Sequence, residues 1–289
     1  MTTISSELID KIKSAFANYG ITLPENTEFV AYDMPDSVTN KYVKVDVNAK
    51  SYIVRLNGNL WPPFTREDES KNLEKLEEAE IKTNVLYNGT ENQICDSIPP
   101  EQRFSKNLDE NKRMKYLKDI GQFIKLYQEN VLFQNSLSIQ NMVSDAFDSL
   151  RNTKGELKNY YDLIMQMILF IEHDGKKMVS SHNDLLPSSI YCIDDEIIIV
   201  DWEYSAKNHP FYDIAYLSVS SPLTEEEDRA FLISYDEFIQ DFSIGQGHSF
   251  ILMKTVISFL VFLWKIGGDT SAELYKKFTK NFQNAIKYV

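Results

Sequence analysis

The sequence predicts an α+β fold in two parts, and three observations support this. Strand-like runs rich in apolar residues fall within the first hundred residues, at 27–32, 41–47, 51–56, 82–87 and 93–98. From Asn107 onward the patterns are mostly helical. One later stretch, Ser180 to Asp213, combines a polar turn with a short strand pair. We therefore expect a sheet-rich part over 1–98 and a mostly helical part over 99–289.

The remaining elements follow from local patterns. Residues 4–19 predict an amphipathic helix, and a second helix begins near Thr65. Ile98-Pro99-Pro100 ends the sheet, because proline cannot donate to a strand ladder. The later helices are predicted around 116–127 and 161–169, from the acidic run at 225–228 through 235–242, over 249–265, and from there to Val289, with glycine breaks at 245–247 and 267–268.

Composition narrows the class of protein. The 289 residues are 43% apolar and 25% charged, an ordinary globular balance. The formal charge of −13 argues against binding nucleic acid, because no basic stripe is available to neutralise phosphates. The apolar run 250–264 is shorter than a membrane span of about 20 residues, so we expect a buried helix and no membrane insertion. Cys95 and Cys192 lack metal-binding spacing, and we expect a cytoplasmic protein.

Two aspartates in the 180–213 stretch are candidates for chemistry. Asp184 lies in a polar turn, and Asp201 ends the apolar run 197–200, which predicts a strand paired with 190–192. The two carboxylates would therefore face each other. This arrangement suits phosphoryl transfer, in which one carboxylate orients a hydroxyl and the other holds Mg²⁺. The spacing alone leaves open that both are ordinary turn residues.

The wider pattern resembles a known family. His182-Asn183-Asp184-Leu185, Val200-Asp201-Trp202-Glu203-Tyr204, and then Asn208, Pro210 and Asp213-Ile214-Ala215 are similar to the catalytic core of the choline/ethanolamine kinases, the bacterial choline kinases in particular. That family belongs to the aminoglycoside phosphotransferase and protein kinase-like superfamily. The resemblance implies a bilobal protein kinase-like fold: an N-lobe with an antiparallel sheet and a helix, a hinge near 96–100, and a mostly helical C-lobe.

The resemblance also implies roles for individual residues. Asp184 would be catalytic, Asp201 would hold Mg²⁺, and His182 and Asp213 would brace the loop. Ser189 stands where the family has an asparagine as second metal ligand. The residues implied in ATP binding are Arg55 with its partner Glu69, the covering loop residues Ser37, Thr39 and Asn40, and the backbone near Asp96, Ser97 and Ile98. The loop lacks the family's glycines.

The implied acceptor is a small amino alcohol. A quaternary ammonium is held best by aromatic faces with a carboxylate, and the implied residues are Glu203, Tyr204 and Trp264. The family's acid on the following helix is Ser220 here, and a second tryptophan is Val261. Choline is the leading candidate for the acceptor, and ethanolamine, other amino alcohols and aminoglycosides are the alternatives. A catalytically weakened pseudokinase that binds nucleotide or a protein partner is the main rival, and the oligomeric state stays open.

Overall fold

The computed structural model describes residues 4–32, 40–105, 107–150, 154–221, 223–237, 246–266 and 271–286. They divide into two compact units, each built from two segments. The first comprises Met1–Phe104 and Ser188–Tyr204, and the second comprises Ser105–Pro187 and Ser205–Val289. A single boundary near residue 98 was predicted. Within the first unit, the Phe104 N–H donates to the Ile190 carbonyl at 2.9 Å, which joins the end of the first segment to the segment 188–204.

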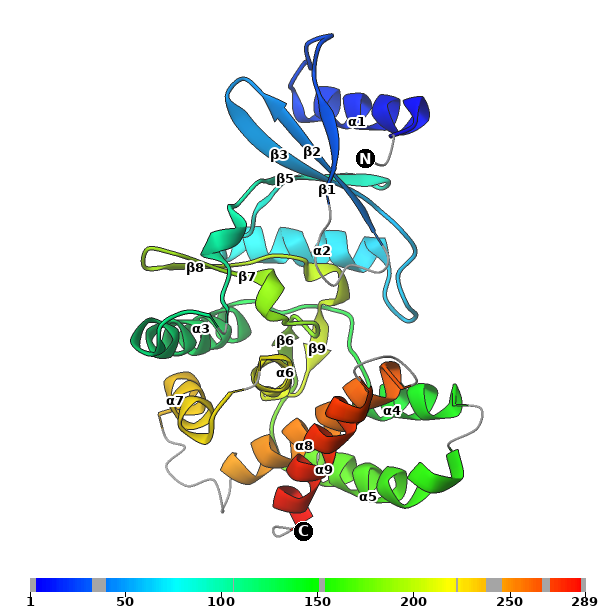
Figure 1. Ribbon diagram of the computed structural model, residues 1–289, viewed down its shortest axis with the longest axis vertical. Coiled ribbons are helices and arrows are strands. Elements are labelled where there is room, and N and C mark those ends of the chain that lie inside the picture. The colour runs from blue at the N-terminus through cyan, green and yellow to red at the C-terminus, as the bar shows by residue number, and fades with distance from the viewer. Residues whose placement is uncertain are drawn as a thin grey trace. The chain divides into compact units, whose positions relative to one another are not determined.

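The first unit is built on an antiparallel sheet with strand order β1-β2-β3-β5-β4. Its strands are β1 Phe29–Tyr32, β2 Lys41–Val47, β3 Lys50–Leu56, β4 Val85–Asn88 and β5 Asn92–Asp96. Helix α1, Ser6–Tyr19, is capped by the Ser5 hydroxyl and ends at Gly20, whose φ of +90° suits glycine. Figure 1 shows α1 lying against this sheet, as the predicted amphipathic pattern requires.

Strand alternation separates the two faces of the sheet. Val54 and Leu56 of β3 face the core that α1 covers, together with Ile12 and Phe16 of the helix. Ile53 lies in a separate cluster with residues of β2 and β5. Because side chains alternate along a strand, Arg55 shares the face of Ile53 and points away from α1. A long cation is thereby placed on a covered face of the sheet.

The predicted hairpin of 190–200 is confirmed. Strand β7, Ile190–Ile193, pairs antiparallel with β8, Glu196–Ile199, through a turn at Asp194 and Asp195. Short helical turns lie near it: η1 Pro100–Gln102, η2 Pro187–Ser189 and η3 Trp202–Tyr204. Helix α2, Arg66–Glu78, begins at the Thr65 cap and packs against η3. The turn η3, which follows the hairpin, therefore lies beside α2 within the first unit.

The second unit is mostly helical. Its helices are α3 Glu110–Asn130, α4 Ile139–Asp148, α5 Lys154–Glu172, α6 Tyr212–Ser220, α7 Glu225–Tyr235, α8 Gln246–Trp264 and α9 Ser271–Ala285. A two-stranded ribbon of β6, Val179–Ser181, and β9, Ala206–Asn208, completes it. Helix α8 packs against α4, α5, α6 and α9, so it is the core helix of this unit (Figure 1).

Two predicted helix boundaries are wrong. The helix expected to run through 235–242 ends at Tyr235, and Asp236 has extended backbone with φ −142°, whereas 238–242 lie outside the described residues. Helix α8 begins at Gln246, so Gly247 lies within a helix and not in a break. Aspartate is a weak helix former, which favours an end at Asp236. Gly245 and the expected break at 267–268 lie outside the described residues.

Helix α8 is also the one segment in the described ranges that is long and apolar enough to cross a membrane. The window Gly247–Trp264 has a mean hydropathy of 1.6, and 72% of it is buried inside the protein. A core helix meets the same criteria, so α8 does not indicate membrane insertion. Both cysteines are buried thiols and not part of a disulfide. Burial raises the pKa of the Cys95 thiol to about 12, which makes it a poor nucleophile.

Candidate active site

The first unit holds a buried arginine that is paired with a carboxylate. The Arg55 side chain is 2% exposed, and its Nη2 lies 2.7 Å from Oε1 of Glu69 on α2. Its Nε donates to Oδ1 of Asn57 at 2.9 Å. Burial acts to lower the pKa of Arg55, but the Glu69, Glu203 and Asp201 carboxylates outweigh it and hold the pKa above its usual value. The guanidinium is therefore fixed in place as a permanent positive charge.

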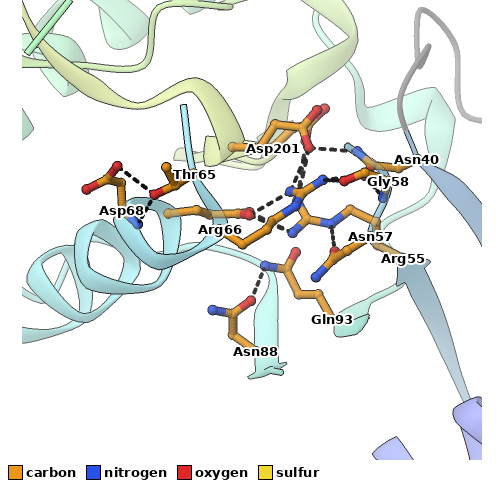
Figure 2. A network of polar contacts seen from close by, with 12 residues as sticks. Asn40, Arg55, Asn57, Gly58, Thr65, Arg66, Asp68, Asn88, Gln93 and Asp201 are labelled. Atoms are coloured by element: carbon orange, nitrogen blue, oxygen red, sulfur yellow. Dashed lines mark hydrogen bonds and ion pairs between the residues drawn. The ribbon is translucent and has the colours of Figure 1, made fainter. Parts of the chain in front are cut away.

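A second arginine extends this network. Arg66 Nη1 lies 2.7 Å from Glu69 Oε2 and 2.9 Å from Glu203 Oε2. Its Nη2 donates to Asn40 Oδ1 at 2.6 Å and to the Gly58 carbonyl at 3.1 Å. Figure 2 shows the Arg55 and Arg66 side chains converging beside Asn40 and Gly58. Helix α2 and the residues flanking β2 and β3 are thus tied together by one charged cluster.

Glu203 takes part in this cluster. Its carboxylate accepts from Asn40 Nδ2 at 2.7 Å and from Arg66, and the residue is only 6% exposed. Its negative charge is therefore largely compensated by arginine. The predicted contact of Glu203 with a substrate cation stays a prediction, and these partners were not expected from the sequence.

Asp201 and Ser189 lie at the open end of the β7–β8 hairpin. The Ser189 carbonyl accepts the Val200 N–H at 2.9 Å, so the residue before β7 and the residues after β8 are side by side. Asp201 has a left-handed backbone with φ +68°, unusual for a residue other than glycine. Its carboxylate lies 3.8 Å from Arg55 Nη1 and is 29% exposed, the most accessible carboxylate of the cluster.

This donor set fits Mg²⁺ of the kind that accompanies a nucleotide. Within the described ranges no group of three or more His, Cys, Asp or Glu side chains could hold a metal ion by itself. Magnesium in phosphoryl-transfer enzymes is bound through one or two carboxylates plus phosphates and water. One carboxylate, Asp201, meets that requirement, and the predicted second ligand Ser189 accepts the N–H of Val200, the residue before Asp201. Three carboxylates against two arginines also leave the cluster with an excess negative charge.

The other predicted residues of the first unit are placed as follows. Tyr204 packs edge to face against Phe64, with ring centroids 5.1 Å apart. The Asp96 and Ser97 N–H groups donate to the Asn84 and Ser51 carbonyls, and the predicted contact of residues 96–98 with adenine stays a prediction. Asn40 is part of the arginine cluster, whereas Ser37 and Thr39 lie outside the described residues.

The second unit holds the other predicted aspartate in a braced loop. The Asp213 carboxylate, at the start of α6, accepts the backbone N–H groups of His182 at 2.8 Å and Asn183 at 2.9 Å. Asn183 has φ +67°, and its Oδ1 accepts from Asn208 Nδ2 at 2.8 Å. The buried Tyr127 hydroxyl also donates to Asp213. The left-handed turn before Asp184 is thereby held in one conformation.

Asp184 itself has a partner that the sequence did not indicate. The Tyr216 hydroxyl, on α6, donates to Asp184 Oδ1 at 2.6 Å. His182 Nδ1 lies 3.3 Å from the Asp184 backbone nitrogen and accepts its N–H, and the bracing role of His182 stays a prediction. A tyrosine within an apolar helix pattern is typical of a core residue. The pattern therefore contained no signal that distinguishes Tyr216 from the other apolar residues of this helix.

A buried network fixes the approach to α6. Asp174 Oδ2 accepts from Ser249 at 2.7 Å and lies 3.1 Å from His209 Nε2. His209 Nδ1 accepts the Phe211 N–H, so Nε2 carries the proton and donates to Asp174. Burial acts to raise the pKa of Asp174, but hydrogen bonds from His209, Ser249 and the Lys176 backbone lower it to about 2.

This network predicts a pH-dependent stability. A carboxyl whose folded pKa is depressed stabilises the fold above its unfolded pKa, and this contribution is lost as the pH falls through the folded value. We expect Asp174→Asn to lower the free energy of unfolding by about 1–2 kcal/mol at pH 7. The difference from wild type should shrink between pH 4 and pH 2. Urea unfolding at several pH values measures it, and a difference independent of pH would contradict the assignment.

The structure brings the predicted residues together in two groups. Arg55, Glu69, Asn40, Glu203 and Asp201 form one charged cluster in the first unit. His182, Asp184 and Asp213 form the braced loop of the second. Trp264, 42% exposed at the end of α8, joins neither group through any described contact. That Asp184 and Asp201 face each other stays a prediction, because they belong to different units.

Several solved structures share the fold of this chain. The choline kinase LicA of Streptococcus pneumoniae has a TM-score of 0.74 at 17% identity, covering 96% of this chain and all of that one. A choline/ethanolamine kinase family protein from Mesorhizobium loti gives 0.72 at 17% identity over 96% and 94%. Spectinomycin phosphotransferase, solved with ADP and spectinomycin, gives 0.60 at 16% identity over 97% and 95%. The fold is therefore the bilobal α+β fold of the protein kinase-like superfamily.

Sequence relatives give the family. The model of the choline/ethanolamine kinase family matches residues 32–238, so the chain belongs to this family of small-molecule kinases. It is 26% identical over 234 residues to the LicA homolog of Metamycoplasma hominis, covering 79% of this chain and 82% of that protein. It is 27% identical over 172 residues to the LicA homolog of Mycoplasma capricolum, covering 58% of this chain and 66%, just under two thirds, of that protein.

Proposed function

We propose that this protein transfers the γ-phosphoryl group of ATP to the hydroxyl of a small amino alcohol, with choline as the leading acceptor. Family membership and the LicA relatives support this proposal. So do the solved relatives bound to AMP or ADP, which favour an adenine nucleotide. The observation that carries it is the buried Arg55–Glu69 pair beside the partly exposed Asp201.

In the proposed mechanism, the first unit binds the nucleotide. Arg55, held by Glu69, contacts the phosphates, and its fixed guanidinium stabilises their charge without having to reorganise. Asp201 and Ser189 would hold Mg²⁺, which when bound neutralises phosphate charge. Arg66 and Asn40 keep Glu203 and helix α2 in place around that arginine. The peptide groups near Ile98 are the proposed contact to adenine.

The second unit supplies the group that acts on the acceptor. The Asp184 carboxylate orients the acceptor hydroxyl and takes its proton as the oxygen attacks phosphorus. His182 and Asp213 hold the loop, so this carboxylate is presented in a fixed direction. Tyr204 and Trp264 are the proposed aromatic contacts to the ammonium group. With a net charge of −13, we expect no nucleic-acid partner. The two widely separated cysteines suit a reducing compartment, and we propose a cytoplasmic protein.

A release assay tests the proposed function. ADP formation from MgATP is measured with choline, ethanolamine, other amino alcohols and aminoglycosides, with Asp184→Ala as the blank. Turnover that depends on one of these acceptors supports the proposal and names the substrate. If no acceptor stimulates ADP formation and MgATP does not raise the Tm, the proposal is contradicted.

One observation favours a second candidate, a nucleotide-binding protein with weak or no turnover. Ser189 replaces the family's asparagine, and a hydroxyl is a poorer Mg²⁺ ligand than an amide carbonyl or a carboxylate. This candidate predicts that ATP raises the Tm while no acceptor is phosphorylated.

The Ser189→Asn variant distinguishes the two candidates. Restoring a carbonyl ligand should lower the Mg²⁺ concentration for half-maximal rate several-fold and raise kcat. The comparison is a magnesium titration of the rate at saturating ATP, with Ser188→Asn as the matched control one residue away. Identical titrations for Ser189→Asn and wild type would show that the serine does not limit metal binding.

A further inference from the structure

Helix α6 contacts the predicted catalytic loop through two residues one turn apart. Asp213 accepts two backbone N–H groups of the loop, and Tyr216 donates to the Asp184 side chain. Residues at i and i+3 lie on the same face of a helix, so both contacts come from one face of α6. One helix therefore fixes the backbone of the turn and the direction of its carboxylate.

The contact between Tyr216 and Asp184 is made by a buried side chain whose ring is held by packing. Tyr216 is 5% exposed, and its ring stacks on Tyr212, with centroids 6.0 Å apart and planes 21° apart. A phenol with few available rotamers loses little entropy when it holds a carboxylate. At 2.6 Å the contact has the length of a charge-assisted O–H···O⁻ bond, which is stronger than one between neutral groups.

We propose that Tyr216 is a positioning residue for the phosphoryl-transfer step, acting through Asp184; this rests on the function proposed above. Its hydroxyl donates to Oδ1 of Asp184, which sets the rotamer of the carboxylate and the direction in which it meets the substrate hydroxyl. Because the hydroxyl donates, it also favours the ionised form that can accept a proton. Asp184 is thereby kept both oriented and charged.

The kinetic test compares two tyrosine hydroxyls on the same helix. Tyr216→Phe should lower kcat about tenfold, the loss of one hydrogen bond to a charged group, with the KM for ATP unchanged. On the acid side of the pH–rate profile, the activity of Tyr216→Phe should fall at a higher pH than that of wild type. The reason is that Asp184 is protonated more easily once the Tyr216 hydroxyl no longer donates to it. Tyr212→Phe keeps the ring that stacks on Tyr216 and removes a hydroxyl that contacts Met142 Sδ at 4.0 Å. Burial and the nearby Asp213 and Asp184 charges raise the pKa of Tyr212, so this hydroxyl stays neutral and its loss should leave kcat at the wild-type value.

Several outcomes would overturn the proposal. A Tyr216→Phe variant with the kcat and pH profile of wild type would overturn it. Equal losses of kcat in Tyr216→Phe and Tyr212→Phe would also overturn it, because they would indicate an effect on packing alone. If the wild-type protein phosphorylates no acceptor, the proposed function fails, and a second measurement still tests the Tyr216 contact. The Asp184 carboxyl is titrated by ¹³C NMR in the full chain, assigned with Asp184→Asn. A higher midpoint in Tyr216→Phe supports the contact, and an unchanged midpoint refutes it.

Discussion

Asp184→Asn should lower kcat by about a thousandfold, in the middle of the range for removing a general base. The substitution keeps the shape of the side chain and an oxygen that can accept from Tyr216, so the loop should stay in place. It removes the negative charge that takes the proton of the acceptor hydroxyl in the proposed mechanism. Steady-state kinetics and ATP binding by calorimetry measure the effect, and the Kd for ATP should stay within a few-fold of wild type.

A matched substitution in the same unit controls for loss of charge. Asp162 on α5 forms an exposed i,i+4 pair with Lys158, which contributes only a few tenths of a kcal/mol. Asp162→Asn should therefore keep wild-type kcat and Tm. Full activity in Asp184→Asn would remove Asp184 from the chemistry. A large drop in its Tm would instead make its role structural.

The second large effect is on stability. Glu69→Ala should lower the free energy of unfolding by about 3–5 kcal/mol, because it leaves the buried Arg55 without its closest carboxylate. For a chain of this size that corresponds to a fall in Tm of roughly 6–15 °C. Arg66 also loses a partner at 2.7 Å. Thermal and urea unfolding measure the change, and ATP affinity should fall with it.

The neighbouring Glu67 provides the control on the same helix. It is exposed and paired with Lys71 at 2.7 Å, so Glu67→Ala should leave the Tm close to that of wild type. Replacing both buried partners, as Arg55→Met with Glu69→Leu, should cost less than Glu69→Ala alone, since no unpaired charge then remains. A Glu69→Ala variant as stable as Glu67→Ala would contradict the buried-pair account.

The residues that were predictable from the sequence are those that break a local pattern. Arg55 is a cation inside an apolar strand, and the apolar run before Asp201 marks a buried strand that ends at a carboxylate. Both strands were predicted from short apolar runs rich in β-branched residues, and the fold confirms them as β3 and β8.

Features that depend on long-range packing could not be predicted. Strands β6 and β9 have three residues each, too short for an alternating pattern. Glu203 is sequentially remote from Arg66 and Asn40, and only the folded unit shows that they neutralise it. Tyr216 carries no sequence signal, because a buried tyrosine on an apolar helix looks the same whether its hydroxyl binds a carboxylate or not.

Detection of the phosphorylated product by ³¹P NMR tests the central claim most directly. Wild-type protein, MgATP and choline, with ethanolamine in a parallel sample, should give a new phosphomonoester resonance together with an equal amount of ADP. The Asp184→Asn sample should show neither over the same time. ADP with inorganic phosphate alone, or no change with either acceptor, would contradict the assignment of this chain as an amino-alcohol kinase.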